Sequence, residues 1–282
     1  MRKILTPEPF GTQSADAVII GGGIIGVATA FWLSRAGMKT ILVEMRDGLS
    51  TLTTTASIES FRAQFTEPAM ATLAMESIQV WENFAQVTGL DGYEIDLHHG
   101  GYLFLTTDEA TVDDVRTTVD GYHKVGVADS EFLTGDEVLR RWPWLSPEVR
   151  AAAFRAKDGW FSAHEVTQGF ARAAEQAMFY LRTRATGIET DAQGVSAVIT
   201  DRGRINTRTV VNAAGPFAVT VGRWVGLDLP IYQMRRQRVF VAPHPKIPQN
   251  APLIMDVDNE SYWRPETGGA LLGWHDPDEQ KS

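Results

Sequence analysis

A glycine-rich turn between two apolar runs constrains this chain more than any other feature of its sequence. The run Ala17–Ile20 leads into residues 21–26, which read Gly-Gly-Gly-Ile-Ile-Gly, and a second run, Thr40–Val43, ends at Glu44. Residues 27–36 between them are apolar at helical spacing. The pattern predicts a buried strand, a tight turn, a helix and a second buried strand within about thirty residues.

Each glycine of this turn has a mechanical purpose. Gly21 lets the strand turn sharply, Gly23 lets the backbone approach a pyrophosphate, and Gly26 lets the helix pack closely on the sheet. The N–H groups of the first helical turn lack intrahelical acceptors and attract phosphate oxygens. Glu44 can accept hydrogen bonds from ribose hydroxyls and would repel a 2′-phosphate. An ordinary glycine-rich turn is the alternative, but the strands, helix and acid together favour a dinucleotide site.

The composition excludes several classes of function. The 282 residues carry a formal net charge of −9, which argues against nucleic acid and anionic membranes as partners. No segment approaches the roughly 18 apolar residues of a membrane span. The chain has no cysteine, which excludes a disulfide and a cysteinyl cofactor bond and fits a cytoplasmic location. The adjacent His98 and His99 would point to opposite faces of a strand, so no metal site is expected.

A second informative motif lies at residues 209–216, which read Thr-Val-Val-Asn-Ala-Ala-Gly-Pro. This is a buried strand that ends on small residues, which let a cofactor or a crossing loop approach the backbone. Plain strand-to-helix packing would explain the motif equally well if it stood alone. Upstream, residues 185–204 alternate like a hairpin with Gly194 and Gly203 as turn residues, and residues 162–165 begin a helix expected to reach about Tyr180.

Together these pieces resemble the D-amino-acid oxidase superfamily of FAD-dependent amine oxidoreductases, with a pattern similar to glycine oxidases, sarcosine oxidases and sarcosine oxidase β subunits. The resemblance covers residues 17–273 and rests on seven pieces in a fixed order. They are the glycine turn with Glu44, the Ser/Thr run within 45–55, Phe-Arg-Ala-Gln-Phe at 61–65, Gly-Gly-Tyr-Leu at 100–103, Asp-Gly-Trp-Phe at 158–161, the strand end at 210–216 and Leu-Leu-Gly at 271–273.

The resemblance implies FAD, bound without a covalent link, as the cofactor. Family members hold it with the glycine turn, the acid, a hydroxyl-rich segment, a backbone position before the hairpin and the Ala-Ala-Gly strand end. The matching residues are Gly21, Gly23, Ile24, Ile25, Gly26, Glu44, Met45, Thr53, Thr54, Thr55, Ala185, Ala213, Ala214 and Gly215. The implied reaction removes a hydride from the carbon next to the nitrogen of an amino acid or secondary amine, such as glycine or sarcosine, and water hydrolyses the resulting imine.

The substrate residues are less well defined by the resemblance. Arg62 matches an arginine that lies near the flavin in relatives, where it could pair with a substrate carboxylate or polarise the ring. A structural salt bridge is the alternative for this residue. Arg236 falls where relatives have a strand entering the substrate domain, and Tyr262 and Trp263 lie on the next strand-like stretch, where they could line a pocket.

Three departures from the family pattern stand out. Glu59 and Ser60 stand where relatives usually carry glycines, just before the arginine, at a point where the chain approaches the flavin. Residues 51–62 contain neither His nor Cys, so a covalent flavin link is not expected there. The sequence ends at Ser282, where relatives continue with a segment that carries substrate ligands. We therefore expect an incomplete site that a partner chain could complete.

Two other classes of function stay open. One is a non-catalytic FAD-binding subunit that a partner completes; the other is an NAD-dependent Rossmann dehydrogenase, which would place further parallel strand–helix units soon after Glu44. The expected fold class is α/β, with a Rossmann-like FAD-binding domain from residues 1–85 and 154–229. A mainly antiparallel substrate domain is expected from residues 86–153 and 230–282.

Overall fold

The two apolar runs of the glycine-turn unit form neighbouring parallel strands inside a five-stranded sheet. In the computed structural model, which describes residues 4–234 and 236–274, β3 (Ala17–Ile20) pairs with β4 (Thr40–Val43), and α1 (Ile24–Arg35) connects them. The strand order is β1-β10-β4-β3-β14, and every neighbouring pair is parallel. The other strands are β1 (Ile4–Leu5), β10 (Ala177–Tyr180) and β14 (Val210–Asn212).

Alternate side chains of β3 and β4 enter two different hydrophobic cores. Ile19 and Leu42 belong to the core shared with α1 and α7 (Ala163–Ala173). Val18 and Ile41 belong to a core shared with a four-stranded sheet of order β11-β12-β13-β2. Because both faces are covered, these strands have continuous apolar sequences rather than alternating ones. The strands of the second sheet are β11 (Ala185–Asp191), β12 (Gly194–Thr200), β13 (Gly203–Asn206) and β2 (Thr12–Ser14).

The predicted hairpin is confirmed, but the predicted length of the helix after residue 162 is wrong. β11 and β12 pair antiparallel, and Gly194 and Gly203 have φ angles of +109° and +154°. Helix α7 ends at Ala173, and residues 177–180 form β10 instead of further helix. This strand is buried between β1 and β4, so pairing with the sheet overrides the local pattern. Along the chain, the next strand of this sheet after β4 is therefore β10.

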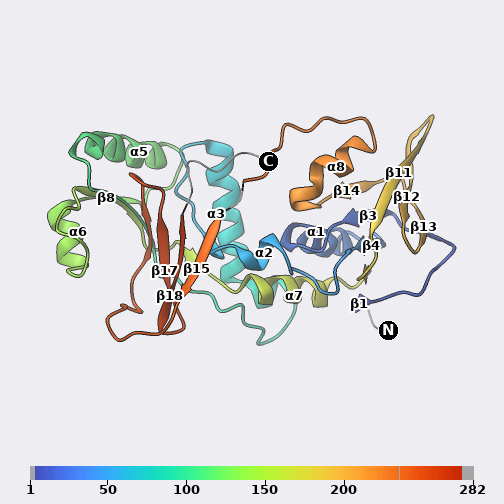
Figure 1. Cartoon of the computed structure of the whole chain (residues 1–282), viewed down its shortest axis with the longest axis horizontal. Helices are drawn as coiled ribbons and strands as arrows, with labels where there is room; N and C mark the ends of the chain where they lie inside the picture. The colour runs from blue at the N-terminus through green and yellow to red at the C-terminus, as the bar shows by residue number, and fades with distance from the viewer. Residues whose placement is uncertain (1–3, 235, 275–282) are drawn as a thin grey trace.

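A seven-stranded, mainly antiparallel sheet forms the other half of the molecule (Figure 1). Its order is β15-β18-β17-β16-β6-β8-β7, and only the β16–β6 pair is parallel. The strands are β15 (Gln237–Val241), β18 (Gly269–Trp274), β17 (Tyr262–Glu266), β16 (Leu253–Asp256), β6 (Tyr102–Thr106), β8 (Ala151–Arg155) and β7 (Glu131–Thr134). The parallel and antiparallel sheets confirm the predicted fold class.

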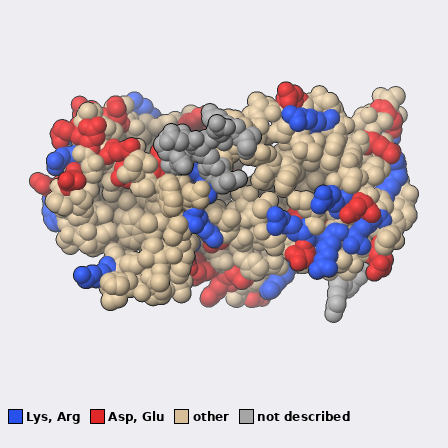
Figure 2. All heavy atoms as spheres, viewed as in Figure 1, with Lys and Arg blue, Asp and Glu red and all other residues tan. Residues whose placement is uncertain are grey.

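Helices α3 (Pro68–Glu82) and α5 (Val112–Lys124) pack on one face of the seven-stranded sheet, and α6 (Gly135–Arg141) lies at its outer end (Figure 1). Two short helices lie elsewhere: α4 (Phe84–Thr88) packs on α7, and α8 (Ala218–Arg223) packs on β14. Both α5 and α6 carry acidic residues in the first turn, where the helix dipole favours negative charge. Figure 2 shows acidic side chains gathered at the left end of the molecule, where α5 and α6 lie in Figure 1.

The predicted division into two domains can be compared with where the elements lie. Strand β8 crosses the predicted boundary between residues 153 and 154 and lies wholly within the seven-stranded sheet. Helix α3, predicted to belong to the FAD domain, packs Ala71 and Ile78 into one core with Val115 and Val119 of α5. The exact ranges of the two domains therefore stay a prediction.

A buried charge network lies beside a short two-stranded sheet, β5 (Ser60–Phe61) with β9 (Gly159–Trp160). The fully buried Asp158 carboxylate accepts hydrogen bonds from the Ala63 N–H at 3.0 Å, from Gln64 Nε2 at 3.2 Å and from Arg155 Nη1 at 2.5 Å. Burial raises the pKa of Asp158, although the arginine and the hydrogen bonds oppose this shift. The network fixes residues 61–64 against β8.

Candidate cofactor site

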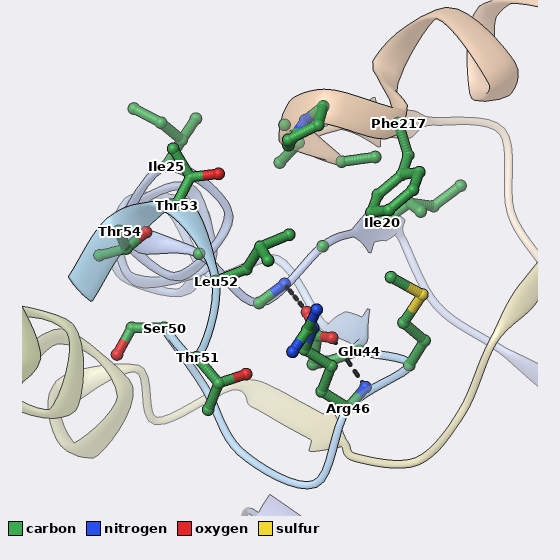
Figure 3. A pocket seen from close by; sticks show the side chains of 18 of the residues that line it. Ile20, Ile25, Glu44, Arg46, Ser50, Thr51, Leu52, Thr53, Thr54 and Phe217 are labelled. Atoms are coloured by element: carbon green, nitrogen blue, oxygen red, sulfur yellow. Dashed lines mark hydrogen bonds between the residues drawn. The ribbon is translucent and has the colours of Figure 1, made fainter. Parts of the chain in front are cut away.

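A cavity of about 750 Å³ opens where the carboxyl ends of β3, β4 and β14 meet the N-terminus of α1 (Figure 3). This is the edge at which open parallel sheets bind their ligands. The lining comes from within residues 20–25, 43–46, 50–60, 161–163, 183–186 and 213–224. Three apolar side chains of this lining remain exposed, namely Ile25 at 68%, Leu52 at 36% and Phe217 at 46%, so one side of the cavity is open.

The glycine turn is shaped by backbone groups that leave no room for side chains. Gly21 has φ of +115°, and a Cβ atom there would overlap the carbonyl group of Ala213. A Cβ atom on Gly26 would overlap the Gly21 carbonyl oxygen. The packing function inferred for Gly26 is thus confirmed, and it explains why this residue does not line the cavity.

Glu44 is held beside the turn by two backbone donors. Its Oε2 atom accepts a hydrogen bond from the Gly22 N–H at 2.7 Å, and its Oε1 atom accepts one from the Arg46 N–H at 2.8 Å (Figure 3). Each carboxylate oxygen has a second lone pair. Glu44 is therefore fixed in orientation and can still accept hydrogen bonds from ribose hydroxyls.

The hydroxyl-rich loop meets the N-terminus of α1 at Thr54. The Ile24 N–H donates to Thr54 Oγ1 at 3.1 Å, and a Cβ atom on Gly23 would lie 3.1 Å from the same oxygen. The Ile24 N–H is therefore occupied by Thr54, while the other N–H groups of the first turn of α1 lack intrahelical acceptors and suit phosphate oxygens. Thr55 differs, because its hydroxyl donates to the Ser50 carbonyl at 2.7 Å.

Most of the predicted cofactor residues surround this one cavity. Gly23, Glu44 and Ala214, which lie far apart in the sequence, all line it. The lining also contains Gly21, Ile24, Ile25, Met45, Thr53, Thr54, Ala185, Ala213 and Gly215. Gly26 and Thr55 are the two predicted cofactor residues outside the lining. Contact of any of these residues with the cofactor stays a prediction.

The predicted substrate residues lie outside the cavity lining. The guanidinium of Arg62 packs 3.9 Å from the ring centre of Phe65 and donates to the Gln64 carbonyl. Arg236 forms an exposed ion pair with Glu260 at 3.5 Å. The other two are Tyr262, which packs against Gly273, and Trp263, whose ring meets that of Trp144 edge-on at 5.8 Å. Their functional roles stay a prediction.

Several lining residues were not predicted from the sequence. Arg46 follows Glu44 closely, and the hydrogen bond from its N–H makes it part of the same turn. Phe217 and Trp224 lie beyond the small-residue strand end, before and after α8. Their closeness in the sequence to Glu44 and to the strand end at residues 209–216 is the signal that could have identified them.

Glu59 is the most unusual lining residue. Its φ of +60° lies in the left-handed region, which a residue with a Cβ atom adopts at a cost of roughly 1–3 kcal/mol. Its side chain is 18% exposed, and Oε2 lies 3.8 Å from Arg264 Nη2. Burial raises the pKa of Glu59, although Arg264 and a hydrogen bond from the Ala163 N–H oppose this shift.

The cavity has the features that FAD requires. Its volume lies within the range of roughly 300–1,000 Å³ found for cofactor and ligand sites. The N-terminus of α1 supplies donors for a pyrophosphate, Glu44 supplies a fixed acceptor for a ribose, and the glycine turn lets the backbone come close. Among the described residues, no helix is long and apolar enough to cross a membrane, and no three His, Asp or Glu side chains converge as a metal site.

Comparisons with known proteins agree with this geometry. Human mitochondrial dimethylglycine dehydrogenase is 25% identical over 98% of this chain and 32% of its own length. The glycine oxidase of Geobacillus kaustophilus is 29% identical over 93% of this chain and 70% of its own length. The crystal structure of L-proline dehydrogenase from P. horikoshii superposes with a TM-score of 0.82 at 25% identity, covering 94% of this chain and 70% of that one. The chain thus spans about a third of the length of the dimethylglycine dehydrogenase.

The family model described as "FAD dependent oxidoreductase" matches residues 16–282. This match includes the glycine turn, Glu44 and the small-residue strand end, so the resemblance to the D-amino-acid oxidase superfamily is confirmed. The chain therefore belongs to the family of FAD-dependent oxidoreductases, and its cofactor is FAD.

Proposed function

We propose that this chain holds FAD in the cavity beside α1 and oxidises a C–N bond of an amino acid or N-substituted amine. The observation that carries the proposal is the convergence of Gly23, Glu44 and Ala214 on one cavity. Three relatives named for dimethylglycine, glycine and L-proline support the substrate class. These three compounds share an amine nitrogen and a carboxylate attached to the same carbon.

The residues around the cavity would divide the binding of FAD between them. Glu44 would accept hydrogen bonds from the ribose, and the first-turn N–H groups of α1 other than that of Ile24, which donates to Thr54, would face the pyrophosphate. Thr53 and Thr54 would supply hydroxyls, and Ala213–Gly215, which are small, would let the cofactor lie close to the backbone. When bound, FAD supplies the acceptor for the hydride that leaves the carbon next to the amine nitrogen.

A spectroscopic titration tests whether the cavity binds FAD. The purified chain should show a flavin absorption spectrum or gain one when FAD is added. Glu44→Ala should weaken FAD binding roughly tenfold to a hundredfold, because hydrogen bonds to a charged group contribute about 1.5–3 kcal/mol. Glu189→Ala, which removes an exposed carboxylate far from the cavity lining, is the control. Equal affinity in wild type and Glu44→Ala would contradict the assignment of this cavity.

A second measurement tests the reaction itself. The FAD-loaded chain is mixed without oxygen with glycine, sarcosine, N,N-dimethylglycine and L-proline in turn, and the visible flavin absorbance is followed. At least one amine should bleach the flavin. Acetate has no nitrogen to oxidise and should leave the spectrum unbleached.

A partner-completed FAD-binding subunit is the second candidate. It is favoured by the open side of the cavity, where Ile25, Leu52 and Phe217 are exposed. FAD would then bind, but amines would bleach it only after further polypeptide is added.

A further inference from the structure

Glu59 lies at the end of the cavity that faces the seven-stranded sheet. The loop after β4 starts at Glu44, passes the N-terminus of α1 where Thr54 meets Ile24, and reaches Glu59 and Ser60 at β5. Under the proposed function Glu44 marks the adenosine end of the cofactor. The Glu59 end is then the part of the cavity left for the redox-active ring and the substrate.

The backbone around Glu59 is fixed in an unfavourable conformation. The φ angle of +60° is stabilised by two hydrogen bonds, from the Phe161 N–H to the Glu59 carbonyl at 3.1 Å and from the Glu59 N–H to Ser57 Oγ at 3.1 Å. A glycine would adopt this angle without strain. Non-glycine residues in such conformations cluster at functional sites, which points to a use for the carboxylate.

Glu59 shares its one buried cation with a second carboxylate. Arg264 is buried and lies 3.8 Å from its carboxylate, but Arg264 also forms a closer ion pair with Glu266 and donates to the Ile58 carbonyl at 2.8 Å. Arg238, the other nearby cation, is exposed and donates to the Thr55 and Ser57 carbonyls. One buried guanidinium is therefore shared by two carboxylates, and of these two only Glu59 lines the cavity.

We propose that Glu59 binds the ammonium nitrogen of the substrate and accepts its proton. This inference rests on the proposed function and specifies the substrate as an amine that enters as a cation. In the step, one proton moves from the nitrogen to a carboxylate oxygen of Glu59, and the N–H bonding pair becomes the nitrogen lone pair. The neutral amine can then release a hydride, because its lone pair stabilises the positive charge that develops on carbon. Burial raises the pKa of Glu59 and makes it a stronger base than an exposed glutamate.

A pair of non-reacting probes tests the binding of the cation. N,N,N-trimethylglycine and 3,3-dimethylbutanoate have the same shape and carboxylate, but only the first carries a positive nitrogen. Binding to the FAD-loaded chain is measured from the change in the visible flavin spectrum. The wild type should bind the cation roughly tenfold more tightly, as expected for a nearby opposite charge that is partly shielded from solvent.

Three variants separate a direct role of the carboxylate from a structural one. Glu59→Gln should bind the two probes with about equal affinity. Glu59→Gly should do the same, and glycine also suits the left-handed backbone. Glu131→Gln is the control, because it removes an exposed carboxylate of β7 outside the cavity lining and leaves Glu59, Glu266 and Arg264 in place. A preference that survives in Glu59→Gln and Glu59→Gly, or that is lost in Glu131→Gln, would overturn the proposal.

The pH dependence of anaerobic flavin reduction tests the proton transfer. In the wild type the rate should fall as the pH drops through the raised pKa of Glu59, with Arg264, Arg238 and Glu266 as the neighbouring charges. Glu59→Gln should be roughly a hundredfold slower at neutral pH, and its rate should follow the ionisation of the free amine. An unchanged profile in Glu59→Gln would contradict the proposal.

Failure of the proposed function would look different. If no amine bleaches the FAD-loaded wild type, the reaction is wrong, while the probe pair still decides whether Glu59 binds a cation. If the chain binds no FAD, the proposed function and the inference about Glu59 fail together.

Discussion

The two ends of the cavity hold their functional groups by different means. At the Glu44 end the groups are backbone N–H donors and glycines, and the acid bonds to Gly22, which is only 22 residues away in the sequence. At the Glu59 end, buried and exposed arginines reach across from the seven-stranded sheet. Arg264 bonds to the Ile58 carbonyl over a separation of 206 residues, and Arg238 bonds to Thr55 over 183. The first end depends on local backbone geometry, and the second depends on long-range charge contacts.

The largest effect is expected from a substitution in the glycine turn, at the Glu44 end of the cavity. In Gly26→Val, the new side chain would overlap the Gly21 carbonyl, and the backbone of the turn would have to move. We expect a loss of at least about 3 kcal/mol in the free energy of unfolding, together with loss of FAD binding. Urea denaturation and flavin titration measure the two quantities.

Gly11→Ala is the matched control for this variant, because a Cβ atom there meets open space and Gly11 has no positive φ. It should unfold at nearly the wild-type urea concentration. A Gly26→Val variant that folds and binds FAD normally would mean that the turn is more adaptable than its packing suggests.

This difference between the ends explains what could be predicted from the sequence. Gly21, Gly26 and Glu44 were assigned correctly as a packed turn with an adjacent acid, because glycine spacing encodes backbone geometry directly. Ala213 and Ala214 were matched to the cofactor site through the family resemblance, and the structure places the Ala213 carbonyl against Gly21. The glycine positions depend on the absence of a side chain, which a sequence shows plainly.

The parts that were missed depend on tertiary contacts. Residues 177–180 form a short apolar run that could belong to either a helix or a strand. The run becomes a strand because it pairs with the neighbouring strands β1 and β4. Arg264 was not singled out, because nothing near it in the sequence indicates that it is buried or that it faces Glu59. Glu59 was noticed as a departure from the family pattern, but its position at the cavity end required the fold.

The next largest effect concerns the buried charge network around Asp158. Asp158→Ala would leave the buried Arg155 without one of its carboxylates and the Ala63 N–H without its acceptor. Removing one partner of a buried ion pair costs about 3–5 kcal/mol, which should appear as a lower urea midpoint. Asp191→Ala removes an exposed ion pair with Arg208 and should lower the urea midpoint much less, because exposed ion pairs contribute little to stability. Equal losses of stability in both variants would mean that the buried and the exposed ion pair contribute equally.

The smallest effect is a pH dependence of the free energy of unfolding that is due to the exposed carboxylate of Asp258. Burial alone would raise the pKa of Asp258, but hydrogen bonds from Thr106 and Thr107, at 2.6–2.9 Å, outweigh it and hold the pKa below its usual range. A lowered pKa in the folded state means that the stabilisation is present above the unfolded pKa and is lost as the pH falls through the folded one.

Asp258→Asn should therefore lower the free energy of unfolding by about 1 kcal/mol at neutral pH, a modest value because the group is exposed. The difference from wild type should start to shrink as the pH falls through the unfolded pKa of about 4, and should vanish below the lower folded pKa, where both proteins carry a neutral group at this position. Urea denaturation at several pH values measures it, with the exposed Asp91→Asn as control. A difference that stays constant with pH would contradict this prediction. It would show that the hydrogen bonds at Asp258 stabilise the protein independently of the charge on the carboxylate.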